Sequence, residues 1–224
     1  MTDARRMVRL DESSLIDADG RLSPVASDLL ALAERAFVVD RETPRGHSPD
    51  DDRWHRQLAI EVRVRDVAPW SKPGVRETVL RLLTWLTDDT WAVTFVRRDS
   101  GEPPRQIPLS LDDTVREVAL FSGGLDATAG AALQVSTSPL LAVGVVTNPA
   151  MGGYQRRVMA ALDQSGLGDF QYSPVPFALV GGGMKDDEPT RRTRGMVFLS
   201  AGVAAALQRA TASGCWSSRT GSAR

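Results

Sequence analysis

The segment Ser122–Asp126 carries the residues best suited to chemistry in this chain. It reads Ser-Gly-Gly-Leu-Asp and follows a short apolar run, Val118–Phe121. Small residues and good helix formers, Ala127–Leu133, come directly after it. An apolar run, two adjacent glycines and a helix-forming run predict a strand, a tight turn and a helix, in that order.

The predicted turn is suited to binding an anion, most often a phosphate. Gly123 and Gly124 allow the backbone a positive φ and let a ligand come close to the main chain. The helix that starts near Asp126 points its unpaired N–H groups back at the turn. A strand, turn and helix without a ligand is the alternative, because adjacent glycines occur in many such turns. The sequence has neither GxxxxGK[ST] nor GxGxxG after a strand, so neither a Walker-type NTPase nor a dinucleotide fold is supported.

The residues SGGLD after a strand resemble the pyrophosphate loop of the PP-loop ATP pyrophosphatases, usually written SGGxDS. Ala127 stands where that family has its last serine. Thr128 carries a hydroxyl one residue later, which a helix would point elsewhere. Those enzymes cleave ATP between its α- and β-phosphates and make an adenylated intermediate. The resemblance therefore implies an adenine nucleotide α-hydrolase-like domain that uses ATP and Mg²⁺.

The resemblance also implies roles for individual residues. The nucleotide would be bound by the loop and by the end of the second strand of the predicted sheet, at Ser122, Gly123, Gly124, Leu125, Asp126, Thr128, Val146 and Thr147. Backbone N–H groups of the glycines would hold the pyrophosphate, and the Ser122 hydroxyl would donate a hydrogen bond. Asp126 is the expected catalytic residue that caps the helix and orients Mg²⁺.

Two further stretches resemble a narrower family, the 7-cyano-7-deazaguanine synthase-like proteins of anti-phage defence. They are the Asp-Arg-x-x-Pro-Arg pattern at Asp40–Arg45 and the segment Thr193–Phe198. The second stretch implies a catalytic role for Arg194, which would contact phosphate and offset the charge of the leaving pyrophosphate.

The implied function is the ATP-dependent activation of a carboxylate or amide on a deazaguanine-type substrate, a queuosine-like chemistry used in phage defence. The implied partners are ATP, this small molecule and a protein of the same defence system. A catalytically impaired nucleotide-binding module is a second hypothesis, which the alanine at position 127 favours. A structural scaffold is a third.

The composition is that of an ordinary globular protein. Of 224 residues, 42% are hydrophobic and 25% are charged. The 27 basic and 28 acidic residues give no bias towards nucleic acid or a membrane surface. One cysteine, Cys215, and two histidines, His47 and His55, do not support a zinc site. The N-terminus has no signal-peptide pattern and no apolar stretch is long enough to cross a bilayer, so a cytoplasmic location is expected.

Residues 1–108 are predicted to form a smaller α+β domain. The periodicity of the apolar residues predicts strands at 6–10, 55–67 and 91–96, helices at 24–38 and 73–86, and a polar loop at 41–52. The Gly/Pro-rich residues 99–108 are the expected domain boundary. Four tryptophans fall in this half: Trp54, Trp70, Trp85 and Trp91. Packing in a core or an interface explains them, and a base-stacking platform is the alternative.

Residues 109–214 are predicted to form the parallel-sheet PP-loop domain, because strands and helices alternate there. Strands are expected at 118–121, 140–147 and 170–176, the last one broken by Pro174, and helices at 126–135, 154–165 and 190–212. Gly166 is expected to stop the second helix, and residues 177–189 to form a loop. Ligands of such sheets bind beyond the carboxyl ends of the strands, where the Ser122–Asp126 loop lies.

Two features of the sequence remain: three arginines at the predicted start of the last helix, and the end of the chain. Arg191, Arg192 and Arg194 either bind an anion or are neutralised by the acidic stretch 186–188. Residues 210–214 are predicted to end the helix, and the small, polar residues 215–224 to be a disordered tail. Because the resemblance implies a further strand after this point, we expect a C-terminally truncated chain.

Overall fold

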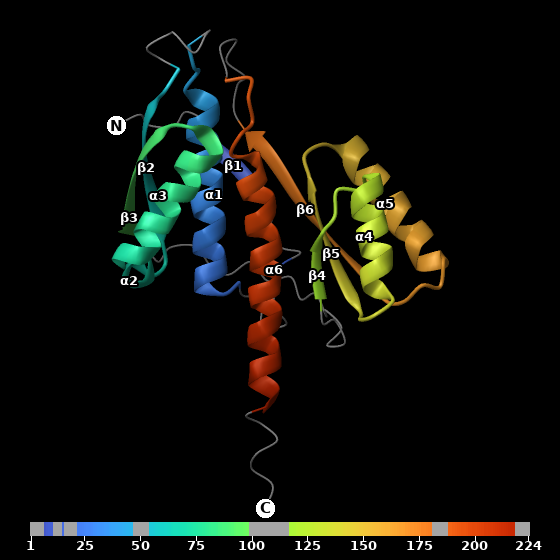
Figure 1. Ribbon diagram of the computed structural model, residues 1–224. Helices are drawn as coiled ribbons and strands as arrows, with labels where there is room; N and C mark the ends of the chain where they lie inside the picture. Colours follow the sequence, from blue (N-terminus) through green and yellow to red (C-terminus); the bar gives the residue numbers. More distant parts are fainter. Residues whose placement is uncertain are drawn as a thin grey trace, which may run out of the picture. The chain divides into compact units, whose positions relative to one another are not determined.

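The protein is described by a computed structural model over residues 7–10, 15, 22–46, 54–98, 117–180 and 188–217. Strands and helices alternate along the chain (Figure 1). The strands are β1 (Met7–Leu10), β2 (Gln57–Val64), β3 (Thr90–Arg97), β4 (Glu117–Leu120), β5 (Leu140–Val146) and β6 (Phe170–Val180). The helices are α1 (Pro24–Glu42), α2 (Val67–Trp70), α3 (Pro73–Thr87), α4 (Leu125–Val135), α5 (Pro149–Gln164) and α6 (Arg194–Ser217). None of these helices has both the length and the apolar composition needed to span a bilayer.

The chain divides into two compact units, each assembled from separate stretches of sequence. The first unit comprises Met1–Arg9, Ser27–Gly101 and Leu179–Val197, and the second comprises Leu10–Ala26, Glu102–Ala178 and Phe198–Arg224. The first unit thus includes a stretch that the predicted division into 1–108 and 109–214 assigns to the other domain. The predicted boundary at 99–108 lies outside the described residues.

A parallel pair of strands forms the framework of the first unit. In β2 and β3, Leu58 lies opposite Trp91 and Ile60 lies opposite Val93. These four side chains are buried and alternate with exposed ones along each strand. Such alternation is expected of strands with one covered face. Helix α3 packs against β3 and buries Leu83 completely.

A network of buried charges joins separate stretches of the first unit. Asp40 in α1 and Asp89 just before β3 both accept hydrogen bonds from Nη2 of Arg56, at 2.6 Å each. Arg45 donates to Asp89 at 2.7 Å, and the Thr193 hydroxyl donates to Asp40 at 2.8 Å. All five side chains are buried. The two charged ends of the Asp-Arg-x-x-Pro-Arg pattern therefore act here as structural ion-pair partners.

Glu188 connects the segment before α6 to the end of α1 through hydrogen bonds. Its carboxylate accepts from the backbone N–H of Arg45 at 2.8 Å and of Thr190 at 3.1 Å, and from the Thr190 hydroxyl. Its own N–H donates to the Arg41 carbonyl at 3.0 Å. Burial alone would raise the pKa of Glu188, but the hydrogen bonds from Thr190 and Arg45 hold that pKa below its ordinary value.

The second unit is built on a parallel sheet. Strands β4, β5 and β6 run parallel to one another, with β5 between the other two. Every residue of β5 except Val146 is buried, as predicted for a central strand covered on both faces. A hydrophobic core packs against this sheet, made of Phe121, Ala131, Val135, Leu140, Ala142, Met159 and Leu162. The structure is thus a mixed α/β protein with small parallel sheets, as expected at the coarse level.

The prediction that Pro174 breaks the third strand of this sheet is wrong. Strand β6 runs without interruption from Phe170 to Val180, so it also includes the first residues of the predicted loop at 177–189. Pro174 and Pro176 are two residues apart and therefore face the same edge of the strand. The N–H of Val175, which lies between them, points to the other edge, so the ladder can continue there.

The bounds of three helices also differ from the prediction. Helix α5 begins at Pro149 and not at 154, because the Asn148 side chain caps it by accepting from the N–H of Met151 at 2.8 Å. Helix α1 extends to Glu42, into the predicted loop at 41–52. Helix α6 begins at 194 and not at 190, and it continues through 217, past the stop predicted at 210–214. The predicted stop after α5 is confirmed, since Gly166 has φ +69°.

Several residues singled out from the sequence lie outside the described part of the chain. They are His47, the glycines at 181–183, Asp186 and Asp187. His55 is described, and its side chain is 66% exposed, as expected for a solvated histidine.

Candidate functional site

The predicted strand, glycine turn and helix are present in the second unit. Strand β4 ends at Leu120, the turn spans 121–124, and α4 begins at Leu125. Gly123 has φ +81°, a conformation that side chains with a Cβ adopt only under strain. A Cβ added to Gly123 would also lie 3.1 Å from Cδ1 of Tyr154. Both the backbone and the packing therefore require glycine at this position.

Polar groups within the turn fix its conformation. The N–H of Gly124 donates to the Ser122 hydroxyl oxygen at 3.2 Å. The Thr128 hydroxyl donates to the carbonyl of Gly124 at 2.8 Å and to that of Gly123 at 3.4 Å. Thr128 therefore reaches back to the turn, contrary to the expectation that its hydroxyl points elsewhere on the helix. Ser122 itself is exposed, so its hydroxyl can meet a ligand.

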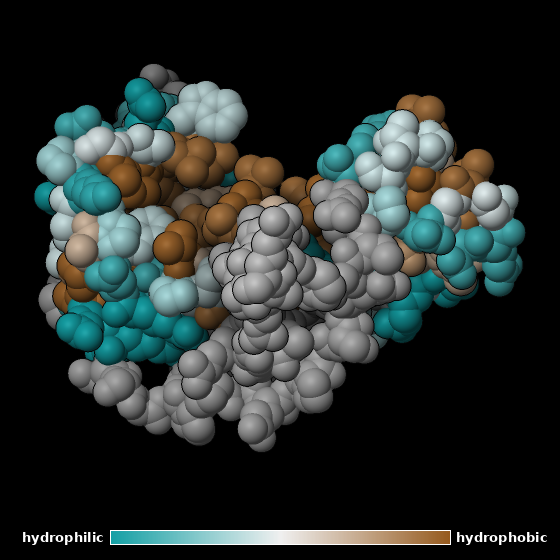
Figure 2. Space-filling view, turned by 90° about the horizontal axis from the view of Figure 1, so that it is seen from below, coloured by the Kyte–Doolittle hydropathy of each residue, from teal (hydrophilic) through white to brown (hydrophobic). Residues whose placement is uncertain are grey.

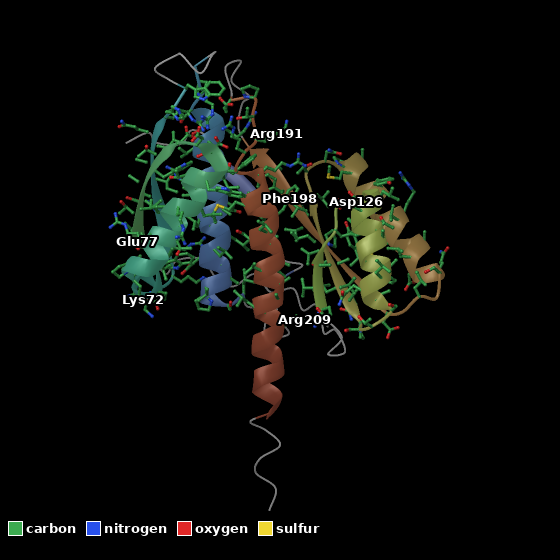
Figure 3. The ribbon with its side chains drawn as sticks, in the orientation of Figure 1. Lys72, Glu77, Asp126, Arg191, Phe198 and Arg209 are labelled. Carbon is green, nitrogen blue, oxygen red and sulfur yellow. The ribbon has the colours of Figure 1, made fainter. Side chains whose placement is uncertain are left out.

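Asp126 lies in the first turn of α4 and is exposed (Figure 3). The helix cap is Gly124, with no side-chain hydrogen bond, so the prediction that Asp126 caps the helix is wrong. The first N–H groups of a helix have no partners within it, and they carry the positive end of the helix dipole. Leu125, which opens the helix, is also exposed. The end of α4 is thus open to an anion.

A buried glutamine of α5, Gln155, donates hydrogen bonds to the backbone of the turn. Gln155 is 1% exposed. Its Nε2 donates to the carbonyls of Phe121 and Ser122, at 3.3 Å each, and its Oε1 accepts from the Tyr172 hydroxyl at 2.8 Å. Burial raises the pKa of Tyr172, with a smaller opposing effect of Arg156, so the tyrosine keeps the proton that it donates. Sequence analysis did not single out either residue.

The side-chain amide of Gln155 also explains why β5 has a glycine at position 144. A Cβ added to Gly144 of β5 would lie 2.8 Å from Cε2 of Tyr172 and 2.9 Å from Oε1 of Gln155. Only glycine leaves room for the hydrogen bond between these two side chains. Three successive elements, β5, α5 and β6, therefore fix one polar contact under the turn.

The structure brings the end of β5 to the same edge of the sheet as the turn. Leu120 of β4 lies opposite Val143 of β5, and the N–H of Phe121 donates to the Val143 carbonyl at 2.8 Å. Because the two strands are parallel, Val146 and Thr147 follow on the carboxyl side, where ligands of such sheets bind. The Thr147 hydroxyl lies 3.6 Å from the sulfur of Met151.

The three arginines of the predicted site belong to a different compact unit from the turn. Arg191, Arg192 and Arg194 belong to the first unit, and Arg194 is the first residue of α6. Arg192 donates to the Thr87 carbonyl at 3.0 Å, and Arg191 is exposed (Figure 3). The role predicted for Arg194 at the phosphates therefore stays a prediction.

The described residues contain no group of three or more histidine, cysteine, aspartate or glutamate side chains that could hold a metal ion. A magnesium ion held mainly by phosphate oxygens needs only one or two carboxylates, and the exposed Asp126 fits that requirement.

The chain has no match among family models, curated proteins or solved structures. Conclusions about function therefore depend on the site itself.

Proposed function

We propose that the second unit binds ATP at the Ser122–Asp126 turn and adenylates a small carboxylate or amide, with release of pyrophosphate. The observation that carries the proposal is the turn itself. It follows a parallel strand, holds Gly123 at φ +81°, and opens into the exposed first turn of α4. This combination of glycine backbone and helix N-terminus is the arrangement by which many proteins bind phosphate groups.

Residues of the turn, of the start of α4 and of the end of β5 have separate parts in the proposed reaction. Backbone N–H groups at the start of α4 hold the β- and γ-phosphates, which leave together as pyrophosphate. The Ser122 hydroxyl donates to a phosphate oxygen, and Asp126 shares the magnesium ion that accompanies ATP. Val146 and Thr147 supply backbone groups for the adenine. These contacts stabilise the charge that builds on the leaving pyrophosphate.

The proposed substrate is a 7-deazaguanine that carries a carboxylate, in the chemistry of 7-cyano-7-deazaguanine synthase-like proteins. Its carboxylate oxygen attacks the α-phosphorus, the bond between the α- and β-phosphates breaks, and an amine then displaces AMP. Anti-phage defence, with a protein partner of the same system, is the proposed context. Arg194 is the proposed additional phosphate contact.

The test is pyrophosphate release from ATP in the presence of magnesium and 7-carboxy-7-deazaguanine. Asp126→Asn removes the carboxylate at the start of α4 and should abolish release. Asp163→Asn is the matched control, since Asp163 is an exposed aspartate near the C-terminal end of a different helix, α5. No release above background by the unmodified chain, or equal release by the two variants, would count against adenylation.

One observation favours a second function, a nucleotide-binding module without chemistry. Ala127 occupies the place of the serine in SGGxDS, and it is partly buried against the core of the second unit. A hydroxyl that could contact phosphate is therefore missing from the third residue of α4. Calorimetry that detects ATP binding, together with no pyrophosphate release, would select this function. Release gained by Ala127→Ser would show that this one hydroxyl accounts for the difference.

A further inference from the structure

We infer that α3 is a self-association surface, which pairs antiparallel with α3 of a second copy of this chain. Isolated apolar residues are common on protein surfaces, and Figure 2 shows brown apolar residues among teal hydrophilic ones. The exposed apolar residues of α3 differ from these by their spacing. Val75 is 37% exposed, Leu82 is 37% exposed and Trp85 is 79% exposed. Their separations of seven and three residues place them on one face of the helix.

Val75, Thr78, Leu82 and Trp85 together form a stripe along one face of α3. Thr78 brings no unsatisfied polar group into this stripe. It lies three residues after Val75 and four before Leu82, so it shares their face. Its hydroxyl donates to the Gly74 carbonyl at 2.7 Å, within the same helix. Its methyl group can therefore be covered by a partner without the loss of a hydrogen bond.

The positions of the stripe residues are symmetric about residue 80, so the stripe can face an antiparallel copy of itself. Counted from residue 80, Val75 and Trp85 are five residues away on either side, and Thr78 and Leu82 are two residues away. An antiparallel pair of α3 helices related by a two-fold axis at residue 80 thus sets Trp85 over Val75 of the other copy, twice. It also sets Leu82 over Thr78, twice. Interfaces with two-fold symmetry need this self-complementarity.

The charges beside the stripe follow the same symmetry. Glu77 and Arg81 are exposed, lie four residues apart, and flank the stripe on the side away from the buried Leu83. In the antiparallel pair, Arg81 of one copy comes level with Glu77 of the other to within two residues, or about 3 Å along the axis. Lys72, just before the helix, comes level with Asp88, just after it, whose carboxylate is 67% exposed and lies 3.7 Å from Nδ1 of His55. Figure 3 labels Lys72, just before α3, and Glu77 within the helix.

The size of the surface sets the strength of the association. Specific interfaces commonly bury about 800 Å² on each partner. One helix of 15 residues covers less than that. The dimer is therefore weak and concentration-dependent, with the exposed Trp85 as the side chain that contributes most to binding.

Sedimentation velocity of the full chain over a range of concentrations tests the inference. We expect a monomer–dimer equilibrium that Trp85→Arg weakens by at least about tenfold, since large aromatic side chains dominate such interfaces. Leu133→Arg is the matched control, because Leu133 is an exposed apolar residue, 75% exposed, on a helix of the second unit. It should leave the equilibrium unchanged.

Charge exchange makes the test specific for the antiparallel pair. Glu77→Arg alone and Arg81→Glu alone each place like charges together at both contacts, and each should weaken self-association about 3–10-fold. An equimolar mixture of the two variants restores both opposite-charge contacts, so it should dimerise at least as strongly as the unmodified chain. A chain that stays monomeric at all concentrations, a neutral Trp85→Arg, or a mixture no better than either variant would overturn the inference.

Discussion

Replacing Gln155 by methionine, which has nearly the same shape, removes the polar support of the glycine turn. The carbonyl of Phe121 would lose a buried hydrogen bond, and the carbonyl of Ser122 and the hydroxyl of Tyr172 would lose partly buried ones. A buried polar group left without its partner costs about 1–3 kcal/mol. The other two groups can turn towards water and should add little. We therefore expect Gln155→Met to destabilise the second unit by about 1–3 kcal/mol in total.

Tyr172→Phe is the matched variant for this prediction. It removes only one of the three hydrogen bonds and should cost about 0.5–1.5 kcal/mol. In the double variant the tyrosine hydroxyl is no longer present to be left unpaired, so the combined cost should be smaller than the sum of the two single costs. Such non-additivity is the signature of a shared contact.

The assay is hydrogen exchange of the β5 amides across a urea series, because it reports on the second unit alone. Four of the five tryptophans, Trp54, Trp70, Trp85 and Trp91, belong to the first unit, so tryptophan fluorescence would report mainly on that unit. A Gln155→Met cost no larger than that of Tyr172→Phe, or fully additive costs, would refute the assignment of Gln155 as the support of the turn.

Three further predictions follow from the described contacts. Gly123→Ala should destabilise the second unit by about 1–2 kcal/mol because of its positive φ, whereas Gly130→Ala, in the open interior of α4, should stabilise it by about 0.5–1 kcal/mol; urea unfolding of both variants checks the opposite signs. Burial would raise the pKa of Asp89, but hydrogen bonds from Arg56 lower it, and the pKa of Glu188 is lowered as well. The stability that these carboxylates contribute is thus complete above their unfolded pKa values of about 4 and is lost as the pH falls below that, and tryptophan fluorescence at low pH should show the first unit unfolding there. Asp89→Asn should cost about 3–5 kcal/mol, since it leaves the buried Arg56 without one of its charged partners, and a neutral result in thermal unfolding would contradict a structural role for the network.

The strand, turn and helix around Ser122–Asp126 could be predicted from the sequence because each of them is a local signal. An apolar run, two glycines and a run of helix formers decide their own conformations. The start of α5 also has a local signal, since Asn148 followed by Pro149 is a helix-start pattern. The adjacent Gly152 and Gly153 have low helix propensity and argue against a helix there. A Cβ on Gly152 would lie 2.9 Å from Val146, so that glycine serves close packing and does not break the helix.

The support of the turn could not be predicted in this way. Gln155 contacts Phe121 and Ser122 across more than thirty positions of sequence, and nothing in its neighbourhood distinguishes it from a surface glutamine. Likewise, the pairing of Asp40 with Thr193 spans 153 positions, so the interleaving of the two units had no local signal. Local chemistry predicts where a turn forms, whereas long-range packing decides what holds it.

The central claim is that the turn after β4 binds the phosphates of ATP. The most direct measurement is amide hydrogen exchange of residues 122–128 with and without magnesium and ATP, compared with the amides of α3 as an internal reference. Binding through the backbone N–H groups predicts slower exchange at 122–128 and no change in α3. Exchange at 122–128 that stays the same at saturating ATP would contradict the claim.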